Sequence, residues 1–385
     1  MDTFHPVTTM GWWSTTFGCA DGCSATDSCA SENLYRTVVD HLVADGYVQA
    51  GYTWLYVEDC WMSRSRDSFG RLVPNVTTFP NGLESITAYA HARGIRVAAS
   101  LDLGAQTCAG LPGSFGHYGL DVVTLANWNV DRVLLTTCSV ANTTSSTTPL
   151  SLYALLSTLT SLASAVNLTS HCVVPSTTNL TLLHAVSGHC QHVQLNPRVE
   201  DDYTDVVRHV EAALHELNDS TTSPFYNASF GPIVAGGYGL TRGQARIQLT
   251  AWYLLRFPLL VAGDVCTSTT VRSSVLNSYF VKLYTAALTA TSRPPKRWTG
   301  VAVPGVDVWL SWIDKSVVIS AFRLHNEAPH VPETLEMGWD DLGLDPAAVC
   351  TVTRVWSANV TVNQKHRFTL TIPPYDAALV VVEPQ

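Results

Sequence analysis

Short apolar runs rich in β-branched residues alternate with longer amphipathic segments from Val7 to Leu288. Many of the amphipathic segments open near Ser, Thr or Asp, which favour helix N-termini. This alternation predicts a (β/α)8 barrel, with a parallel cylinder of strands inside a ring of helices. The expected strands are Val7–Trp13, Tyr52–Glu58, Ile95–Leu101, Arg132–Leu135, Cys172–Pro175, Val193–Leu195, Pro232–Ala235 and Pro258–Ala262. The expected helices are Glu32–Ala44, Leu83–Arg93, Ser151–Val166, Tyr203–Leu217, Thr241–Leu255 and Val271–Leu288.

The chain changes character after Arg297, where strand-like runs follow one another without clear helices between them. Consecutive strands of this kind predict an antiparallel β-sandwich. We therefore divide the chain into a barrel domain, residues 1–296, and a C-terminal β-domain, residues 297–385. The expected strands of the second domain are Val306–Trp312, Val317–Phe322, Thr351–Trp356, Phe368–Ile372 and Ala378–Val382.

Charge and hydropathy limit the partners of the chain. The formal net charge is −9, and the one concentrated basic stretch, Arg293–Arg297, is typical of a solvated linker. Both observations argue against binding to nucleic acid or to an anionic membrane. The most apolar stretch, Trp252–Ala262, is interrupted by Arg256 and Pro258, so no run of about 18 uncharged apolar residues predicts a membrane span. No signal-peptide pattern follows Met1, and the expectation is that a leader has been removed.

Cysteines and glycosylation signals both indicate the secretory pathway. The chain has ten cysteines against four methionines, an even number that fits complete disulfide pairing in an oxidising compartment. We therefore expect an extracellular, cell-surface or endolysosomal glycoprotein. N-glycosylation sequons stand at Asn75, Asn142, Asn167, Asn179, Asn218, Asn227 and Asn359.

Function in such a barrel is built at the carboxyl ends of the strands. Glu58, Asp59 and Asp102 are candidates for acid/base chemistry or for contacts to sugar hydroxyls. A nucleophile at Thr136–Thr137, with His171 as its base, is a weaker alternative. The histidines near Cys190, at positions 184, 189 and 192, match no zinc spacing, so neither a metal nor a cofactor is expected. The predicted strand ends carry Trp12, Glu58, Asp59, Asp102, Thr136, Val173, Arg198 and Asp264.

Several spaced motifs resemble glycoside hydrolase family 27, the lysosomal α-galactosidases and α-N-acetylgalactosaminidases. The agreement is dense from Met10 to Cys138, patchy from Cys172 to Asp264 and architectural in the C-terminal domain. The motifs are Met10–Trp12, Gly18–Glu32, Glu58–Trp61, Cys108–Gly116 and Trp128–Asp131, with Ile372–Tyr375 near the end of the chain.

The resemblance implies a set of disulfides. The pairs are Cys19–Cys60, Cys23–Cys29, Cys108–Cys138 and Cys172–Cys190. Cys266 and Cys350 have no counterparts in the family, and one expectation is that they link the barrel to the β-domain.

The resemblance also implies a retaining mechanism, in which one carboxylate is the nucleophile and a second, about 5 Å away, is the acid and base. Alignment on Cys138 places Thr136 at the nucleophile position, and alignment on Cys190 places Arg198 at the acid/base position. A threonine hydroxyl is a weak nucleophile without a base, and an arginine does not release its proton. The surrounding sugar contacts are replaced by Ser100, Leu134, Val173 and Gln194, which leaves a vestigial pocket of Trp12, Glu58, Asp59 and Asp102.

Three functions compete on this basis. The favoured one is a catalytically inactive, secreted or surface pseudoenzyme whose barrel is a scaffold for an unknown protein partner. The second is a non-catalytic glycan-binding protein, and the third is a glycoside hydrolase with relocated catalysts among Glu58, Asp102 and Asp264. Because enzymes of the family are often dimers, a homodimer is one expectation for the oligomeric state.

Overall fold

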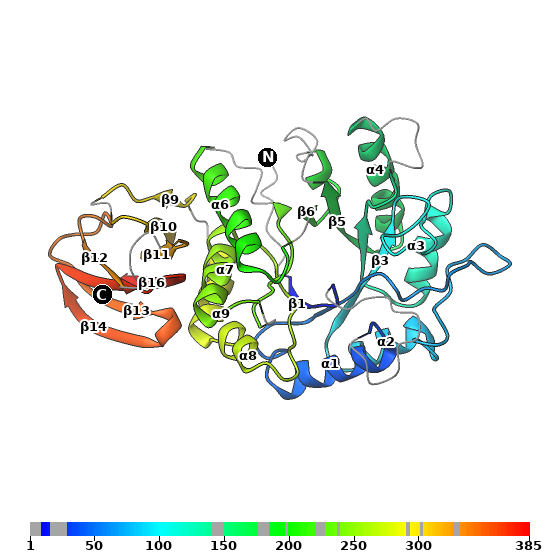
Figure 1. Ribbon diagram of the computed structural model, residues 1–385, viewed down its shortest axis with the longest axis horizontal. Coiled ribbons are helices and arrows are strands. Elements are labelled where there is room, and N and C mark those ends of the chain that lie inside the picture. The colour runs from blue at the N-terminus through cyan, green and yellow to red at the C-terminus, as the bar shows by residue number, and fades with distance from the viewer. Residues whose placement is uncertain are drawn as a thin grey trace.

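The computed structural model describes residues 9–15, 29–140, 149–175, 185–196, 199–219, 228–236, 239–289, 293–300, 303–325 and 332–385. Within these residues the chain forms a parallel (β/α)8 barrel followed by an antiparallel β-sandwich, and the predicted fold class is confirmed (Figure 1). No helix in the described part of the chain is long and apolar enough to span a membrane.

The barrel is one parallel sheet of eight strands in the order β7-β6-β5-β4-β3-β2-β1-β8. It closes where Ile233 bridges Val261, with Ile233 N donating to Leu260 O at 2.7 Å. The seventh strand is earlier and shorter than predicted, because Gly231 has a φ of 107° and Pro232 has no N–H to contribute to a sheet. The strands are β1 (Met10–Trp13), β2 (Trp54–Val57), β3 (Arg96–Asp102), β4 (Arg132–Thr136), β5 (Thr169–Pro175), β6 (His192–Asn196), β7 (Ala228–Ser229) and β8 (Leu259–Val261).

Gly11 in the Met-Gly-Trp motif is required by the contact of β1 with β2. A Cβ atom at this position would lie 2.1 Å from Trp54 O. Only glycine therefore lets the two strands approach in the observed register.

Helices surround the strands and are stabilised by caps that the sequence contains. Ser31 accepts a hydrogen bond from Leu34 N at the start of α1, and Thr241 and Gln244 form a capping box at the start of α7. The predicted helix over Val271–Leu288 is two helices, because Asn277 accepts a hydrogen bond from Phe280 N and starts a new one. The helices are α1 (Glu32–Ala44), α2 (Gly82–His91), α3 (Tyr118–Asn127), α4 (Pro149–Ala165), α6 (Tyr203–Asp219), α7 (Arg242–Leu255), α8 (Thr269–Val275) and α9 (Ser278–Thr289).

The C-terminal domain packs two antiparallel sheets around its own apolar core. One sheet has six strands in the order β14-β13-β16-β11-β10-β9, and the other pairs β12 with β15. The sequence patterns missed β9, β12 and β14, which are short or polar. The strands are β9 (Lys296–Arg297), β10 (Asp307–Ile313), β11 (Ser316–Arg323), β12 (Glu333–Gly338), β13 (Val349–Arg354), β14 (Asn359–Lys365), β15 (Arg367–Ile372) and β16 (Asp376–Pro384).

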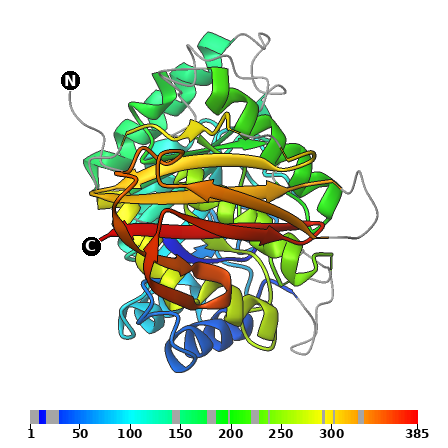
Figure 2. The same cartoon turned by 90° about the vertical axis from the view of Figure 1, so that its left-hand side faces the viewer.

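The six-stranded sheet lies against α7 of the barrel, and the 3-10 turn Val355–Ser357 lies against α9 (Figures 1 and 2). Trp356 stacks on Phe280 with ring centroids 5.1 Å apart and donates to Thr250 Oγ1 at 3.1 Å. Arg246 on α7 binds Asp376 on β16 through both carboxylate oxygens, with Nε to Oδ1 at 2.9 Å. A buried, hydrogen-bonded junction therefore joins the two domains.

The structure contains two of the implied disulfides, Cys108–Cys138 and Cys172–Cys190. Cys29 and Cys60 are also disulfide-bonded, and their expected partners, Cys23 and Cys19, lie outside the described residues.

The suggested link between Cys266 and Cys350 is wrong, because both are free thiols. Cys350 is buried in the sandwich core, whereas Cys266 packs against the barrel core, where burial raises its pKa to about 11.

The sequons differ in how they are placed. Asn167 and Asn359 are exposed, and Asn75 is half-buried. Asn218 lies in α6, while Asn142, Asn179 and Asn227 lie outside the described residues.

Candidate functional site

Side chains alternate along each barrel strand between the helical layer and the barrel interior. On β4, Val133 and Leu135 pack in the large core beneath the helices. Leu134 instead belongs to an interior cluster that also contains Trp13, Tyr56 and Val173. Thr136, two residues beyond Leu134, therefore points inward at the carboxyl end of β4.

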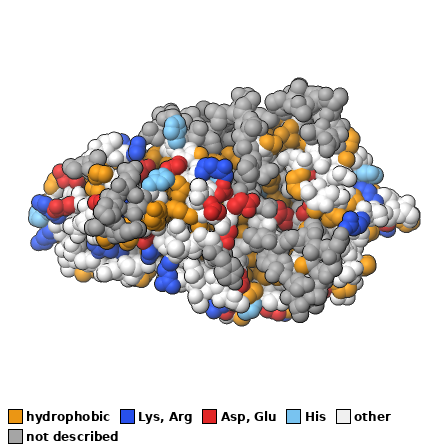
Figure 3. Space-filling model, in the orientation of Figure 1, with side chains coloured by type: hydrophobic (Ala, Val, Ile, Leu, Met, Phe, Trp, Pro, Cys, Tyr) orange, Lys and Arg blue, Asp and Glu red, His pale blue; other side chains and the backbone are white. Residues whose placement is uncertain are grey.

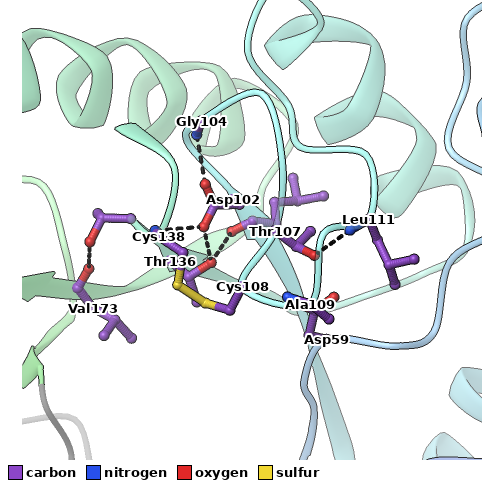
Figure 4. Close-up of a disulfide and its surroundings, with 12 residues drawn as sticks. Asp59, Asp102, Gly104, Thr107, Cys108, Ala109, Leu111, Thr136, Cys138 and Val173 are labelled. Atoms are coloured by element: carbon purple, nitrogen blue, oxygen red, sulfur yellow. Dashed lines mark hydrogen bonds between the residues drawn. A yellow bond between two sulfur atoms is a disulfide. The ribbon is translucent and has the colours of Figure 1, made fainter. Parts of the chain in front are cut away.

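Thr136, at the expected nucleophile position, is hydrogen-bonded to a carboxylate of the neighbouring strand. Its Oγ1 donates to Asp102 Oδ2 at 2.6 Å (Figure 4). The same carboxylate accepts from Cys138 N at 2.9 Å and from Gly104 N at 2.7 Å. Asp102 is only 1% exposed, so it fastens the ends of β3 and β4 together and does not line an open pocket.

Asp59 has a similar anchoring role at the end of β2. Its Oδ1 accepts from Cys60 N at 2.9 Å, and its Oδ2 accepts from Ala109 N at 3.0 Å. The second contact holds the loop that carries Cys108, which is disulfide-bonded to Cys138. Glu58, next to Asp59, is half-buried.

Two other predicted strand-end residues, Trp12 and Asp264, also form hydrogen bonds with the backbone. Trp12 is 1% exposed, and its Nε1 donates to Gly263 O at 3.1 Å. Asp264 accepts hydrogen bonds from Thr267 Oγ1, and from Cys266 N and Thr267 N at 2.8 and 3.0 Å. Burial raises its pKa, but these hydrogen bonds, the hydroxyl first, hold the pKa below its ordinary value. Asp264 therefore closes a turn. Arg198, at the expected acid/base position, lies outside the described residues.

The positions of the family's other sugar contacts form a mostly apolar floor beneath this site. Leu134 is fully buried, and Val173 and Gln194 are opposite each other in the register between β5 and β6. The Gln194 Oε1 and Ser100 Oγ atoms are buried without a hydrogen-bond partner among the described residues. This floor offers no charged group to a sugar.

The structure does not bring the alternative nucleophile to its expected base, His171. Thr136 bonds to Asp102, and Thr137 Oγ1 donates to Val173 O at 3.2 Å. His171 lies opposite Leu134 in the register, deeper in the barrel, where its Nδ1 contacts Tyr56 Oη at 3.2 Å. The expected base therefore does not meet the expected hydroxyl groups.

One group of potential metal ligands occurs among the described residues, Asp102 with Cys108 and Cys138. The two cysteines form a disulfide, which uses the sulfur atoms that would bind a metal. His189 contacts Tyr153 Oη at 3.1 Å, whereas His192 contacts Thr9 Oγ1 at 2.6 Å. His184 lies outside the described residues, so the histidines near Cys190 do not form a site in the part that is described.

Sequence reasoning missed a buried polar cluster around Arg132 at the amino-terminal end of the barrel. Arg132 is 1% exposed, and its guanidinium lies 3.9 Å from the Trp54 ring centroid. It donates to Tyr56 Oη at 2.7 Å and to Thr9 Oγ1 at 3.1 Å. Among the described residues no carboxylate pairs with it. The sequence feature that could have revealed this cluster is a basic residue at an inward-facing position of a predicted barrel strand.

Arg132 and burial keep two neighbouring histidines neutral. Burial, with a smaller effect of Arg132, lowers the pKa of His171 to about 3 and that of His192 well below its ordinary value. Because Tyr56 accepts a hydrogen bond from Arg132, its hydroxyl can donate to His171 Nδ1. Neutral His171 then carries its proton on Nε2.

The fold and the strand-end geometry define the class of this protein, a (β/α)8 barrel with a C-terminal antiparallel β-sandwich. The family profile Melibiase_2, described as alpha galactosidase A, matches residues 7–282. The chain belongs to this family, within glycoside hydrolase family 27.

Individual relatives agree with this assignment. Human alpha-galactosidase A is 30% identical over 276 residues, which cover 67% of this chain and 61% of the relative. Chicken alpha-N-acetylgalactosaminidase is 29% identical over 290 residues, covering 70% and 67%. The crystal structure of alpha-galactosidase I from Mortierella vinacea matches with a TM-score of 0.80 and 17% identity, covering 98% of this chain and 97% of that one. At 17% identity this last likeness shows the fold alone. The stretch that matches human alpha-galactosidase A covers under two thirds of that relative.

Proposed function

We propose that this protein is a catalytically inactive member of its family, a secreted or surface glycoprotein whose barrel is a scaffold for a protein partner. The observation that carries the proposal is the hydrogen bond from Thr136, at the nucleophile position, to Asp102. A retaining glycosidase needs a carboxylate at that position. The nearest carboxylate, Asp102, is 1% exposed and also accepts hydrogen bonds from Gly104 N and Cys138 N, so it is held at the strand ends and is not presented to a sugar.

Relocated catalysis has little support among the strand-end carboxylates. Both oxygens of Asp59, Asp102 and Asp264 accept hydrogen bonds from neighbouring groups. Carboxylates engaged in this way stabilise loops and strand ends. Glu58 is the half-buried acid next to Asp59, and it is the residue that we choose to test by substitution.

We expect the purified protein to cleave aryl α-galactosides and aryl α-N-acetylgalactosaminides no faster than a no-protein blank. Loss of the nucleophile removes the covalent step, and acid/base catalysis alone contributes about 10²–10⁴-fold. Released nitrophenol, measured over days at several pH values, checks this expectation. Turnover that co-purifies with the protein and disappears in Glu58→Gln, but not in the exposed-site variant Glu336→Gln, would establish relocated catalysis.

Restoring both catalytic carboxylates with Thr136→Asp and Arg198→Asp is expected to give no useful galactosidase. The apolar floor of Leu134 and Val173 cannot replace lost charged contacts, and transition-state stabilisation depends on positioning as much as on the reacting groups. The test compares kcat/KM of the double variant with that of an active family enzyme. A value within about 100-fold of the active enzyme would show that the pocket is still competent.

The partner surface is proposed to lie on the strand-end loops at residues 138–150 and 225–239, much of which lies outside the described residues. Loops on a rigid barrel can change without disturbing its core. On the described part of the face in Figure 3, acidic and basic side chains are interspersed without an extended basic area, which suits a protein partner better than nucleic acid.

A pull-down run beside a glycan array tests the partner class. Loss of protein binding when these two loops are exchanged for unrelated sequences of equal length would support the scaffold function. Glycan binding that free galactose inhibits would support the glycan-binding function instead. The disulfides are consistent with the secretory pathway, and we propose an extracellular, cell-surface or endolysosomal location.

A further inference from the structure

Strand β14 forms an open edge of the sandwich. It is the last strand of the six-stranded sheet and pairs, among the described residues, only with β13. All of its residues are exposed or half-exposed. Figure 1 shows it along the lower margin of the sandwich, and it begins just after the turn Val355–Ser357, which contacts α9. An exposed edge strand can pair with a strand of another molecule through its backbone groups.

The two halves of β14 differ in how well they are protected. Thr361 pairs with Val352 and Gln364 pairs with Cys350, so β14 has one extra residue between these pairs. Asn363 in this bulge has a φ of 55°. The bulge interrupts regular pairing in the second half, which ends at Lys365.

The first half has regular pairing and exposed apolar side chains. Val360 is 43% exposed and Val362 is 56% exposed, and residues 359–362 contain neither a charge nor a proline. If the two segments of a pair of molecules met in antiparallel orientation, Val360 would face Thr361 and Asn359 would face Val362 of the second copy. Such pairs oppose no like charges and suit β-branched side chains.

Asn359 is also the first residue of a sequon, Asn359-Val360-Thr361. Asn359 is exposed and is the first residue of the regular segment, so a bulky group on it would lie next to that segment. An N-linked oligosaccharide is large and strongly hydrated.

We propose that Asn359 carries an N-linked oligosaccharide that shields the regular half of β14 and prevents it from pairing with β14 of a second copy. The bulge and Lys365 protect one half of the edge, and the oligosaccharide protects the other. The inference depends on passage through the secretory pathway but not on the absence of catalysis or on any partner.

The test uses the full chain secreted from a glycosylating host. Mass spectrometry of the peptide that contains Asn359 measures occupancy, and light scattering across a concentration series measures mass. We expect Asn359→Gln to raise the weight-average mass at least two-fold relative to the glycosylated protein at the highest concentration. The matched control is Asn167→Gly, which removes an exposed sequon at a turn where φ is 63° and glycine is tolerated. It is expected to leave the mass unchanged.

Two further measurements distinguish edge pairing from other association. Adding Val362→Lys to Asn359→Gln places a charge on the exposed edge and is expected to restore the original mass. Enzymatic removal of oligosaccharides from the native protein should produce the same increase in mass. This measurement does not depend on the folding of a variant. An unmodified Asn359, an unchanged mass after its oligosaccharide is lost, or no rescue by Val362→Lys would each overturn the proposal.

Discussion

Replacing Arg246 with methionine is expected to lower the free energy of unfolding by about 3–5 kcal/mol, because it leaves the Asp376 carboxylate buried without its cation. The Asp376 side chain is 6% exposed and that of Arg246 is 27% exposed. The pair joins α7 to β16, so its loss acts on the junction of the two domains. Guanidinium unfolding, followed by tryptophan fluorescence, measures the change.

Two variants show whether the effect comes from the unpaired charge. Arg246→Met combined with Asp376→Asn removes both charges and is expected to recover most of the lost stability. Arg367→Met breaks the exposed pair with Glu336 and is expected to leave the unfolding midpoint unchanged. A double variant as unstable as Arg246→Met alone would show that packing, and not charge, is responsible.

The pH dependence of this effect has a definite sign. Burial raises the pKa of Asp376 above its ordinary value, although Arg246 opposes the change. Without Arg246 the pKa rises further, and the carboxyl group is protonated more readily in the folded protein. A carboxyl group with a raised folded pKa costs stability as the pH rises through that pKa. The loss caused by Arg246→Met is therefore expected to be greater at pH 7 than at pH 4.5.

Acidification from pH 6.5 to pH 5 is expected to destabilise the protein by up to about 4 kcal/mol through His171 and His192 alone. Both are buried and neutral in the fold, and their pKa values lie below the ordinary value of 6.5. The unfolded chain binds protons in this range and the folded chain does not, so stability falls by about 1.4 kcal/mol per pH unit for each histidine. For His171 the fall continues towards its folded pKa of about 3.

His171→Asn and His192→Gln test the assignment, since each keeps an amide near the hydrogen bond that the imidazole makes. Each variant is expected to reduce the difference in unfolding free energy between pH 6.5 and pH 5 by about 2 kcal/mol. The exposed-site variant His117→Gln is the control and is expected to leave most of that difference in place. If the histidine variants keep the wild-type pH dependence, other groups cause the acid sensitivity. A confirmed dependence would favour a neutral compartment over an acidic one.

Periodicity and motifs predicted the barrel well where local signals agree with the tertiary structure. Glu32–Ala44 is a helix with the predicted bounds, because Ser31 caps it and its apolar face is regular. The prediction of Pro232–Ala235 as a strand was wrong, because a proline and a left-handed glycine interrupt pairing that the apolar run alone suggested. Edge strands such as β14 were missed because their residues are mostly polar and exposed. Such a strand shows no alternation of buried apolar and exposed polar residues in the sequence.

The sequence by itself determined the family and the (β/α)8 architecture, since spacing and residue type are local properties. It also predicted Thr136 and Arg198 at the catalytic positions, which stays a prediction. Only the tertiary structure decided that the Thr136 hydroxyl binds Asp102, that Asp59 and Asp264 hold backbone groups, and that Cys266 and Cys350 remain apart. It also revealed the Arg132 cluster, whose members come from distant strands. Hydrogen bonds and burial depend on which strand ends meet in space, and that meeting is a property of the closed barrel.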